Sequence, residues 1–156
     1  MKTLPAFFPS RARIGVLTVE PVGLLDYLAP EGGVAQGQLV LVPLGPRRLG
    51  ERGFNQALEI ARPLAKTLGI ELQPRLAERA VDTVAHSGVS PRERPRNIRG
   101  AFAVPRDMAH LVHGRHIGVV DDIMSSGHTL GEIATMLKRH GAARVSNFVF
   151  ARTPPR

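Results

Sequence analysis

The sequence predicts an α/β domain, with a mainly parallel sheet flanked by helices over residues 38–156, preceded by a short β-rich extension over residues 1–37. Two observations favour this class. Apolar, β-branched runs of strand length alternate with apolar patterns of helical period, and residues 115–132 read as strand, acidic edge, loop and helix. A length of 156 residues with 43% hydrophobic content suffices for one domain with a core.

Composition limits the partners and the location. The formal net charge is +8, and most of the 21 basic residues are Arg, a side chain suited to phosphate and nucleic acid. Biased genome composition would produce the same excess of Arg. The absence of Cys excludes disulfides and Cys-based zinc sites. No apolar run reaches the length of a membrane span and no signal peptide is evident, so we expect a cytoplasmic protein without membrane contact.

The N-terminal extension has the pattern of short strands. Apolar residues recur from Ile14 to Val19, a second apolar stretch covers residues 24–28, and a Pro/Gly turn over residues 29–33 precedes the apolar run 39–42. A partial β domain of roughly 40 residues seldom holds itself together. We therefore expect the first strands either to cover an edge of the α/β sheet or to remain poorly packed.

The next segment has helical spacing. Apolar residues three and four apart predict a helix from Phe54 to Leu68 that ends at Gly69. Pro63 lies within this pattern and removes a backbone hydrogen bond, so we expect a kink or two shorter pieces near Ile60. A short strand over residues 70–72 should follow.

Residues 74–100 are polar and basic. The part from Pro91 to Arg99 has too little apolar surface to form rigid core, which indicates a mobile loop. Residues 101–104 predict a returning strand, and an irregular piece rich in His leads from there to the strand 117–120.

The end of the chain repeats the alternation. Leu130, Ile133, Ala134 and Leu137 form one apolar helical stripe, which Arg139, His140 and Gly141 bring to an end. Residues 145–150 predict a last strand, and the two prolines at 154 and 155 stop the fold.

The loop after the 117–120 strand has the chemistry of a phosphate site. Ser125, Ser126, Gly127 and Thr129 offer hydroxyls and backbone N–H groups where a helix begins, which suits a dianionic phosphate. Two adjacent acids, Asp121–Asp122, would repel that phosphate unless they accept hydrogen bonds from sugar hydroxyls or face a divalent cation. The residues therefore favour a phosphorylated sugar over an ordinary capped βα turn. Neither a P-loop nor a dinucleotide fingerprint occurs in the chain.

The stretch VVDDIMSSGHTL resembles the phosphoribosyl pyrophosphate (PRPP) motif of type I phosphoribosyltransferases. Within that superfamily residues 42–153 resemble the ComF family, through VPLGPRRLGERGFNQA, HSGVSPRERPRNIRGAF and GAARVSNFVFARTP. The resemblance implies the type I phosphoribosyltransferase-like fold and Mg²⁺-dependent transfer of 5-phosphoribosyl with release of pyrophosphate. It also implies Mg²⁺ held largely by ligand and water, without a direct protein ligand.

The same resemblance assigns roles to individual residues. Asp121 and Asp122 would hold the ribose hydroxyls as the catalytic pair. The loop binding the 5′-phosphate would comprise Met124, Ser125, Ser126, Gly127, His128 and Thr129, with His128 either contacting phosphate or capping the turn.

Two further segments match loops of the superfamily. Residues 46–56 would form the pyrophosphate loop with Arg47, Arg48 and Arg52, unless these arginines are simply solvated. The flexible loop would supply Arg92, Arg94 and Asn97, although His86 stands where related sequences often carry Gln.

The N-terminus departs from the ComF pattern, because the usual Cys-rich zinc element is missing. Residues 11–48 instead resemble the start of the DNA-binding domain of the primosomal helicase PriA, which indicates a fusion or a replaced segment. Three functions remain open: a PRPP-binding transferase with an unknown acceptor, a nucleic-acid-binding accessory protein in DNA uptake or replication restart, and a fusion product without independent function. Expected partners are PRPP or another phosphorylated ribose, DNA through the basic loops, and a second copy in a homodimer.

Overall fold

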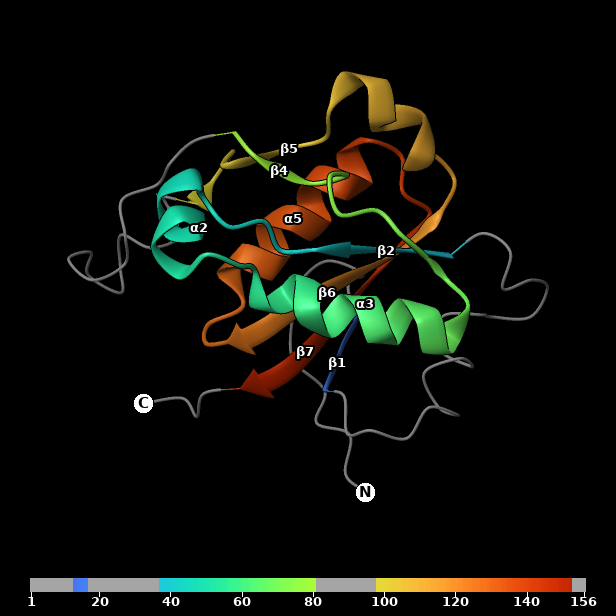
Figure 1. Ribbon diagram of the computed structural model, residues 1–156. Coiled ribbons are helices and arrows are strands. Elements are labelled where there is room, and N and C mark those ends of the chain that lie inside the picture. Colours follow the sequence, from blue (N-terminus) through green and yellow to red (C-terminus); the bar gives the residue numbers. More distant parts are fainter. Residues whose placement is uncertain (1–12, 17–36, 81–97, 153–156) are drawn as a thin grey trace.

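The computed structural model describes residues 13–16, 37–80 and 98–152. Its main feature is a five-stranded sheet in the order β1-β7-β6-β2-β3, in which every described pair of strands is parallel. The predicted α/β class with a parallel sheet flanked by helices is therefore confirmed (Figure 1). The strands are β1 (Arg13–Val16), β2 (Gly37–Leu41), β3 (Glu71–Leu72), β6 (His116–Met124) and β7 (Arg144–Arg152), and the longer helices are α3 (Gln56–Leu68) and α5 (His128–Arg139).

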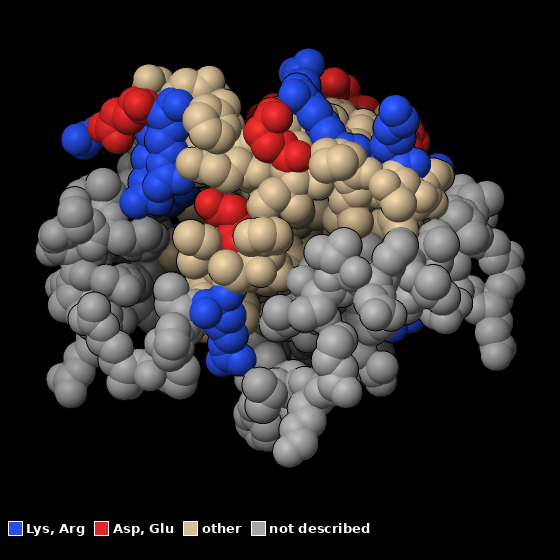
Figure 2. All heavy atoms as spheres, turned by 60° about the horizontal axis from the view of Figure 1, so that its bottom comes forward, with Lys and Arg blue, Asp and Glu red and all other residues tan. Residues whose placement is uncertain are grey.

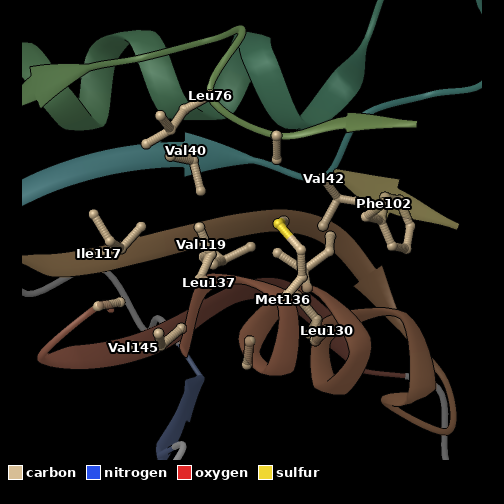
Figure 3. Packing of buried hydrophobic residues seen from close by; sticks show 14 of the residues in the cluster. Val40, Val42, Leu76, Phe102, Ile117, Val119, Leu130, Met136, Leu137 and Val145 are labelled. Carbon is tan, nitrogen blue, oxygen red and sulfur yellow. The ribbon is translucent and has the colours of Figure 1, made fainter. Parts of the chain in front are cut away.

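Successive side chains along a strand point to opposite faces of the sheet, and each face has its own apolar core. Val119 belongs to the larger apolar cluster, which lies under α5, whereas the adjacent Val120 packs with Phe148 in the cluster under α3. The two helices accordingly lie on opposite faces of the sheet (Figure 1). Figure 3 shows the α5 side, where side chains from β2 and β6 point toward those of the helix, including Val40 and Leu137.

Helix α3 begins and ends with clear signals. The side chain of Asn55 accepts a hydrogen bond from the backbone N–H of Ala57 at 3.0 Å, and Gly69 closes the helix in the left-handed conformation. Two shorter pieces near Ile60 are not found, because the helix is continuous through Pro63. The alternative expectation, a kink, stays a prediction. Pro63 lies on the exposed side, where water can satisfy the backbone carbonyl that loses its partner.

Part of the segment expected to be a polar loop is structured. Residues Glu78–Arg79 form β4, which pairs antiparallel with β5 (Phe102–Ala103), the returning strand predicted from the sequence. Leu76 is fully buried in the cluster under α5, and Ile98 joins it at 4% exposure. Two apolar anchors therefore hold the ends of a segment whose overall composition is polar. The remainder of the proposed flexible loop lies outside the described residues.

The first strand joins the main sheet. β1 pairs with β7 in parallel, with Arg13 beside Ser146 and Val16 beside Val149. The expectation that the first strand covers the edge of the α/β sheet is thus confirmed for β1. The strand expected over residues 24–28 lies outside the described part, and the domain boundary between residues 37 and 38 stays a prediction.

Candidate functional site

The carboxyl ends of β2, β6 and β7 meet at one edge of the sheet, which is where open α/β sheets bind ligands. β6 is longer than predicted and continues through the acid pair to Met124. The reason is its pairing with β7, which sets Asp121 beside Val149, Ile123 beside Ala151 and Met124 beside Arg152. The two acids therefore lie within the paired part of the strand, and only residues 125–127 form the loop.

The acid pair is tightly organised. Asp121 is 8% exposed, and its Oδ1 accepts a hydrogen bond from the backbone N–H of Asp122 at 2.9 Å. Asp122 Oδ1 accepts the next backbone N–H, that of Ile123, also at 2.9 Å. Burial, followed by the hydrogen bond and the negative charge of Asp122, raises the pKa of Asp121 to about 7. One proton is therefore readily held by this pair near neutral pH, which lowers the repulsion of an anionic ligand.

The loop after β6 leads directly into α5. Gly127 is the N-cap with a φ of 79°, a conformation that favours glycine, and no side chain caps the helix. The first N–H groups of α5 are thus left for a ligand or water. His128 Nδ1 lies 2.6 Å from Ser126 Oγ, so the ring contacts the loop rather than capping the helix.

The residues predicted to bind the 5′-phosphate differ in their exposure to solvent. Ser125, Ser126 and His128 are exposed and Thr129 is partly exposed. Met124 does not fit the loop, since it ends β6 and its side chain is buried in the apolar cluster under α5. The sequence predicts Met124 as a loop residue, but Met124 lies in strand β6. Pairing with β7 extends this strand four residues beyond the apolar run 117–120 from which it was predicted.

The segment expected as a pyrophosphate loop is a short helix, α2 (Pro46–Arg52). Pro46 starts it, as proline favours the first helical position, and Gly53 ends it in the left-handed conformation. Arg47 forms an ion pair with Glu51 at 3.0 Å on the surface, and Arg52 is exposed. Arg48 is half-buried, so the three arginines do not share one environment.

Charges of both signs gather on one face of the molecule. Figure 2, which brings the underside of Figure 1 forward, shows acidic side chains near the middle with basic side chains on either side. α2 follows β2 and Arg152 ends β7, so cations stand on both flanks of the strand that carries the acid pair. The predicted flexible-loop residues Arg92, Arg94 and Asn97 lie outside the described residues.

Sequence reasoning missed Arg152. The register places it next to Met124, one residue before the phosphate-loop candidates, and its side chain is exposed. The available signal was its position as a basic residue closing the last strand, at the edge of the sheet that carries the acids. Phe150, on the same strand, was also missed, and its side chain is 63% exposed.

Comparison with known proteins gives the family. The family model described as the phosphoribosyl transferase domain matches residues 55–155, which include the acid pair, the loop and α5. The chain belongs to this family. Its relatives include DNA utilization protein YhgH of Escherichia coli K12, at 37% identity over 74% of this chain, and Competence protein F of Haemophilus influenzae, at 29% identity over 73%. Both support the resemblance to ComF proteins.

The chain spans about half the length of these curated relatives, with 49% covered in each. Among solved structures, it is similar to the allosteric regulatory enzyme of purine biosynthesis, at 23% identity and a TM-score of 0.48, covering 83% of this chain and 25% of that one. A purine phosphoribosyltransferase from Pyrococcus horikoshii gives 16% identity and a TM-score of 0.43, with 85% and 80% covered.

Two features are absent from the described residues, a cluster of metal-binding side chains and a membrane-spanning helix. Within residues 13–16, 37–80 and 98–152, no group of three or more His, Cys, Asp or Glu side chains could hold a metal ion. In the same part of the chain, no helix combines the length and the apolar character needed to cross a membrane.

Proposed function

We propose that this protein binds PRPP and transfers its 5-phosphoribosyl group to an acceptor, releasing pyrophosphate. The observation that carries the proposal is the continuity of β6, the residue 125–127 loop and α5. It places a pair of hydrogen-bond-accepting acids within a few residues of an uncapped helix N-terminus. One phosphorylated ribose can meet both features at once, with its hydroxyls on the acids and its 5′-phosphate on the loop.

Each part of the ligand has a matching group. Asp121 and Asp122 each accept a backbone N–H group with Oδ1, which fixes their orientation. The remaining hydrogen-bonding capacity of the two carboxyl groups would then serve the ribose hydroxyls. Ser125 and Ser126 are exposed at the loop and can donate to the 5′-phosphate, together with the N–H groups of α5. Arg48 and Arg52, following β2, would offset the charge of the leaving pyrophosphate.

Asp121 and Asp122 are suited to Mg²⁺ only when the ion is bound together with the ligand. Two carboxylates, each already holding a backbone N–H, provide too few free oxygens for a protein-built octahedral site. When bound, Mg²⁺ would neutralise pyrophosphate oxygens while water and ligand supply most of its coordination. The acids then act on the ribose, and the reaction depends mainly on positioning and charge stabilisation.

Thermal unfolding with PRPP and Mg²⁺ tests this proposal. Ligand at about 100 times its dissociation constant stabilises the folded state by about 2.7 kcal/mol, which raises the melting temperature by several degrees. The double substitution Asp121→Asn with Asp122→Asn should abolish the shift, because both hydroxyl acceptors are weakened without loss of volume. Asp107→Asn, an exposed acid outside the site, should leave it intact. A ligand-induced shift that persists in the double variant would contradict the proposal.

A second candidate function is nucleic-acid binding without catalysis. It is favoured by the net charge of +8 and by relatives whose names refer to DNA utilization and competence. The basic residues of α2 and the PriA-like segment over residues 11–48 would then contact phosphate backbones. DNA affinity should fall steeply with salt and be unaffected by Asp121→Asn with Asp122→Asn. Salt-independent or undetectable DNA binding would exclude this candidate.

A further inference from the structure

The backbone of Val42, the residue after β2, links the strand of the acid pair to the start of α3. Its N–H donates a hydrogen bond at 2.9 Å to the carbonyl oxygen of Val120, the residue before Asp121. Its own carbonyl oxygen accepts a hydrogen bond from Nδ2 of Asn55 at 3.1 Å. The other side-chain atom of Asn55, Oδ1, accepts the N–H of Ala57 at 3.0 Å. One side chain therefore joins the end of β2 to the first turn of α3.

Helix α2 lies within the segment that this hydrogen bond closes. Val42 and Asn55 are 13 positions apart, and α2 occupies residues 46–52 between them. No residue of α2, a helix that the structure describes in full, is buried. Packing of side chains into the core therefore contributes little to the placement of α2, which depends instead on how the two ends of residues 43–54 are held.

The junction between α2 and α3 does not have the apolar contact that often fixes the entry of a helix. A hydrophobic residue just before an N-cap commonly packs against the fourth residue of the helix. Here the residue before the Asn55 cap is Phe54, but the fourth helical residue is Glu59, and Phe54 is 52% exposed. The polar contacts of Asn55 take the place of this apolar contact at the junction.

We propose that Asn55 is a positioning residue, which holds the arginines of α2 at a fixed separation from the acid pair. This inference rests on the proposed function, in which Arg48 and Arg52 offset the charge of pyrophosphate while the acids hold the ribose. The two parts of PRPP are covalently joined, so one molecule can meet both protein groups only at a matching separation. Without the bond from Asn55 to Val42, residues 43–54 must be ordered when the ligand binds, and this cost lowers the affinity for ligands that carry pyrophosphate.

Asn55→Ser isolates the hydrogen bond to Val42. Ser is as good a helix N-cap as Asn, so the bond from the N–H of Ala57 is kept, whereas the shorter hydroxyl does not reach the carbonyl oxygen of Val42. The substitution also adds no charge near the pyrophosphate. Calorimetric titration of the full chain in the presence of Mg²⁺ compares PRPP with ribose 5-phosphate, which lacks the pyrophosphate. We expect Asn55→Ser to weaken PRPP binding by about 10-fold, the size of one neutral hydrogen bond, and to leave ribose 5-phosphate affinity unchanged.

A control variant separates positioning from a general loss of helix stability. Ala61→Gly weakens the interior of α3 without touching Asn55 or Val42, so it should lower the melting temperature and leave the ratio of PRPP to ribose 5-phosphate affinity unchanged. If that ratio is also unchanged in Asn55→Ser, confirmed as folded by its thermal transition, the inference is overturned while the proposed function survives. A parent chain that binds PRPP no more tightly than ribose 5-phosphate would overturn the inference too. Absence of any binding of either ligand would instead remove the proposed function and this inference together.

Discussion

Glu132 on α5 accepts a hydrogen bond from the backbone N–H of Gly100 at 2.8 Å, although 32 positions separate the two residues in sequence. Gly100 has a φ of +70° and immediately precedes the buried residues that lead into β5. This bond joins the helix that begins at the phosphate-loop candidate to the segment that follows the predicted flexible loop. The hydrogen bond thus fixes the position of Gly100 relative to the N-terminal part of α5.

Loss of this bond should be measurable. Glu132→Ala should lower the free energy of unfolding by about 1 kcal/mol, because a hydrogen bond to a charged acceptor is lost at a partly exposed position. Glu132→Gln keeps a carbonyl acceptor and should lose less. Urea denaturation gives both values, with Glu59→Ala, which removes a surface ion pair on α3, as the control. Equal effects of Glu132→Ala and Glu59→Ala would show that the bond contributes nothing specific.

The sequence predicts most of the sheet because local patterns and tertiary context agree there. The apolar run at Ile117 to Val120 and the helical stripe from Leu130 to Leu137 both appear where expected, with all four stripe residues buried. Helix α3 appears as well, and it is not divided at Pro63. Local propensity disfavours proline at that position, whereas packing of the opposite face of the helix holds it in place.

The candidate site was only partly predictable, since several of its features depend on contacts between distant segments. The acid pair and the hydroxyl loop are contiguous, so they could be read directly from the sequence. The extension of β6 through Met124, and the placement of Phe150 and Arg152 beside it, follow from pairing with β7, which no local pattern encodes. Leu76 and Ile98 were likewise assigned to polar loop, because isolated apolar residues give no periodic signal.

Gly118 is a position where only glycine fits. A Cβ atom there would lie 2.7 Å from Leu39 Cδ2 and 2.9 Å from Phe148 Cε2, both in the core under α3. Gly118→Ala should therefore lower the free energy of unfolding by about 1–3 kcal/mol through overpacking. Gly131→Ala is the matched control, because a Cβ in that part of α5 meets nothing within 4 Å, and it should stabilise the chain by about 1 kcal/mol. Urea denaturation of both variants measures the contrast, and destabilisation by both would contradict it.

Burial of Asp121 should make stability depend on pH. Its pKa rises from 3.8 to about 7 on folding, so between these values the folded chain holds a proton that the unfolded chain has released. The unfolded state then binds fewer protons than the folded state, and the free energy of unfolding falls as pH rises through this window. Asp121→Asn cannot titrate but retains an oxygen to accept the N–H of Asp122. It should match the parent chain near pH 4 and exceed its stability near pH 8, by an amount on the order of a few kcal/mol.

Urea denaturation of the parent chain and of Asp121→Asn at several pH values between about 4 and 8 checks this prediction. The difference between the two curves isolates Asp121, because the other titrating groups are common to both. Asp107→Asn, which alters an exposed acid, should follow the parent curve. If the difference between parent and Asp121→Asn is constant across the window, then Asp121 is ionised throughout in the folded state. The acid pair would in that case present two full negative charges to any anionic ligand at neutral pH.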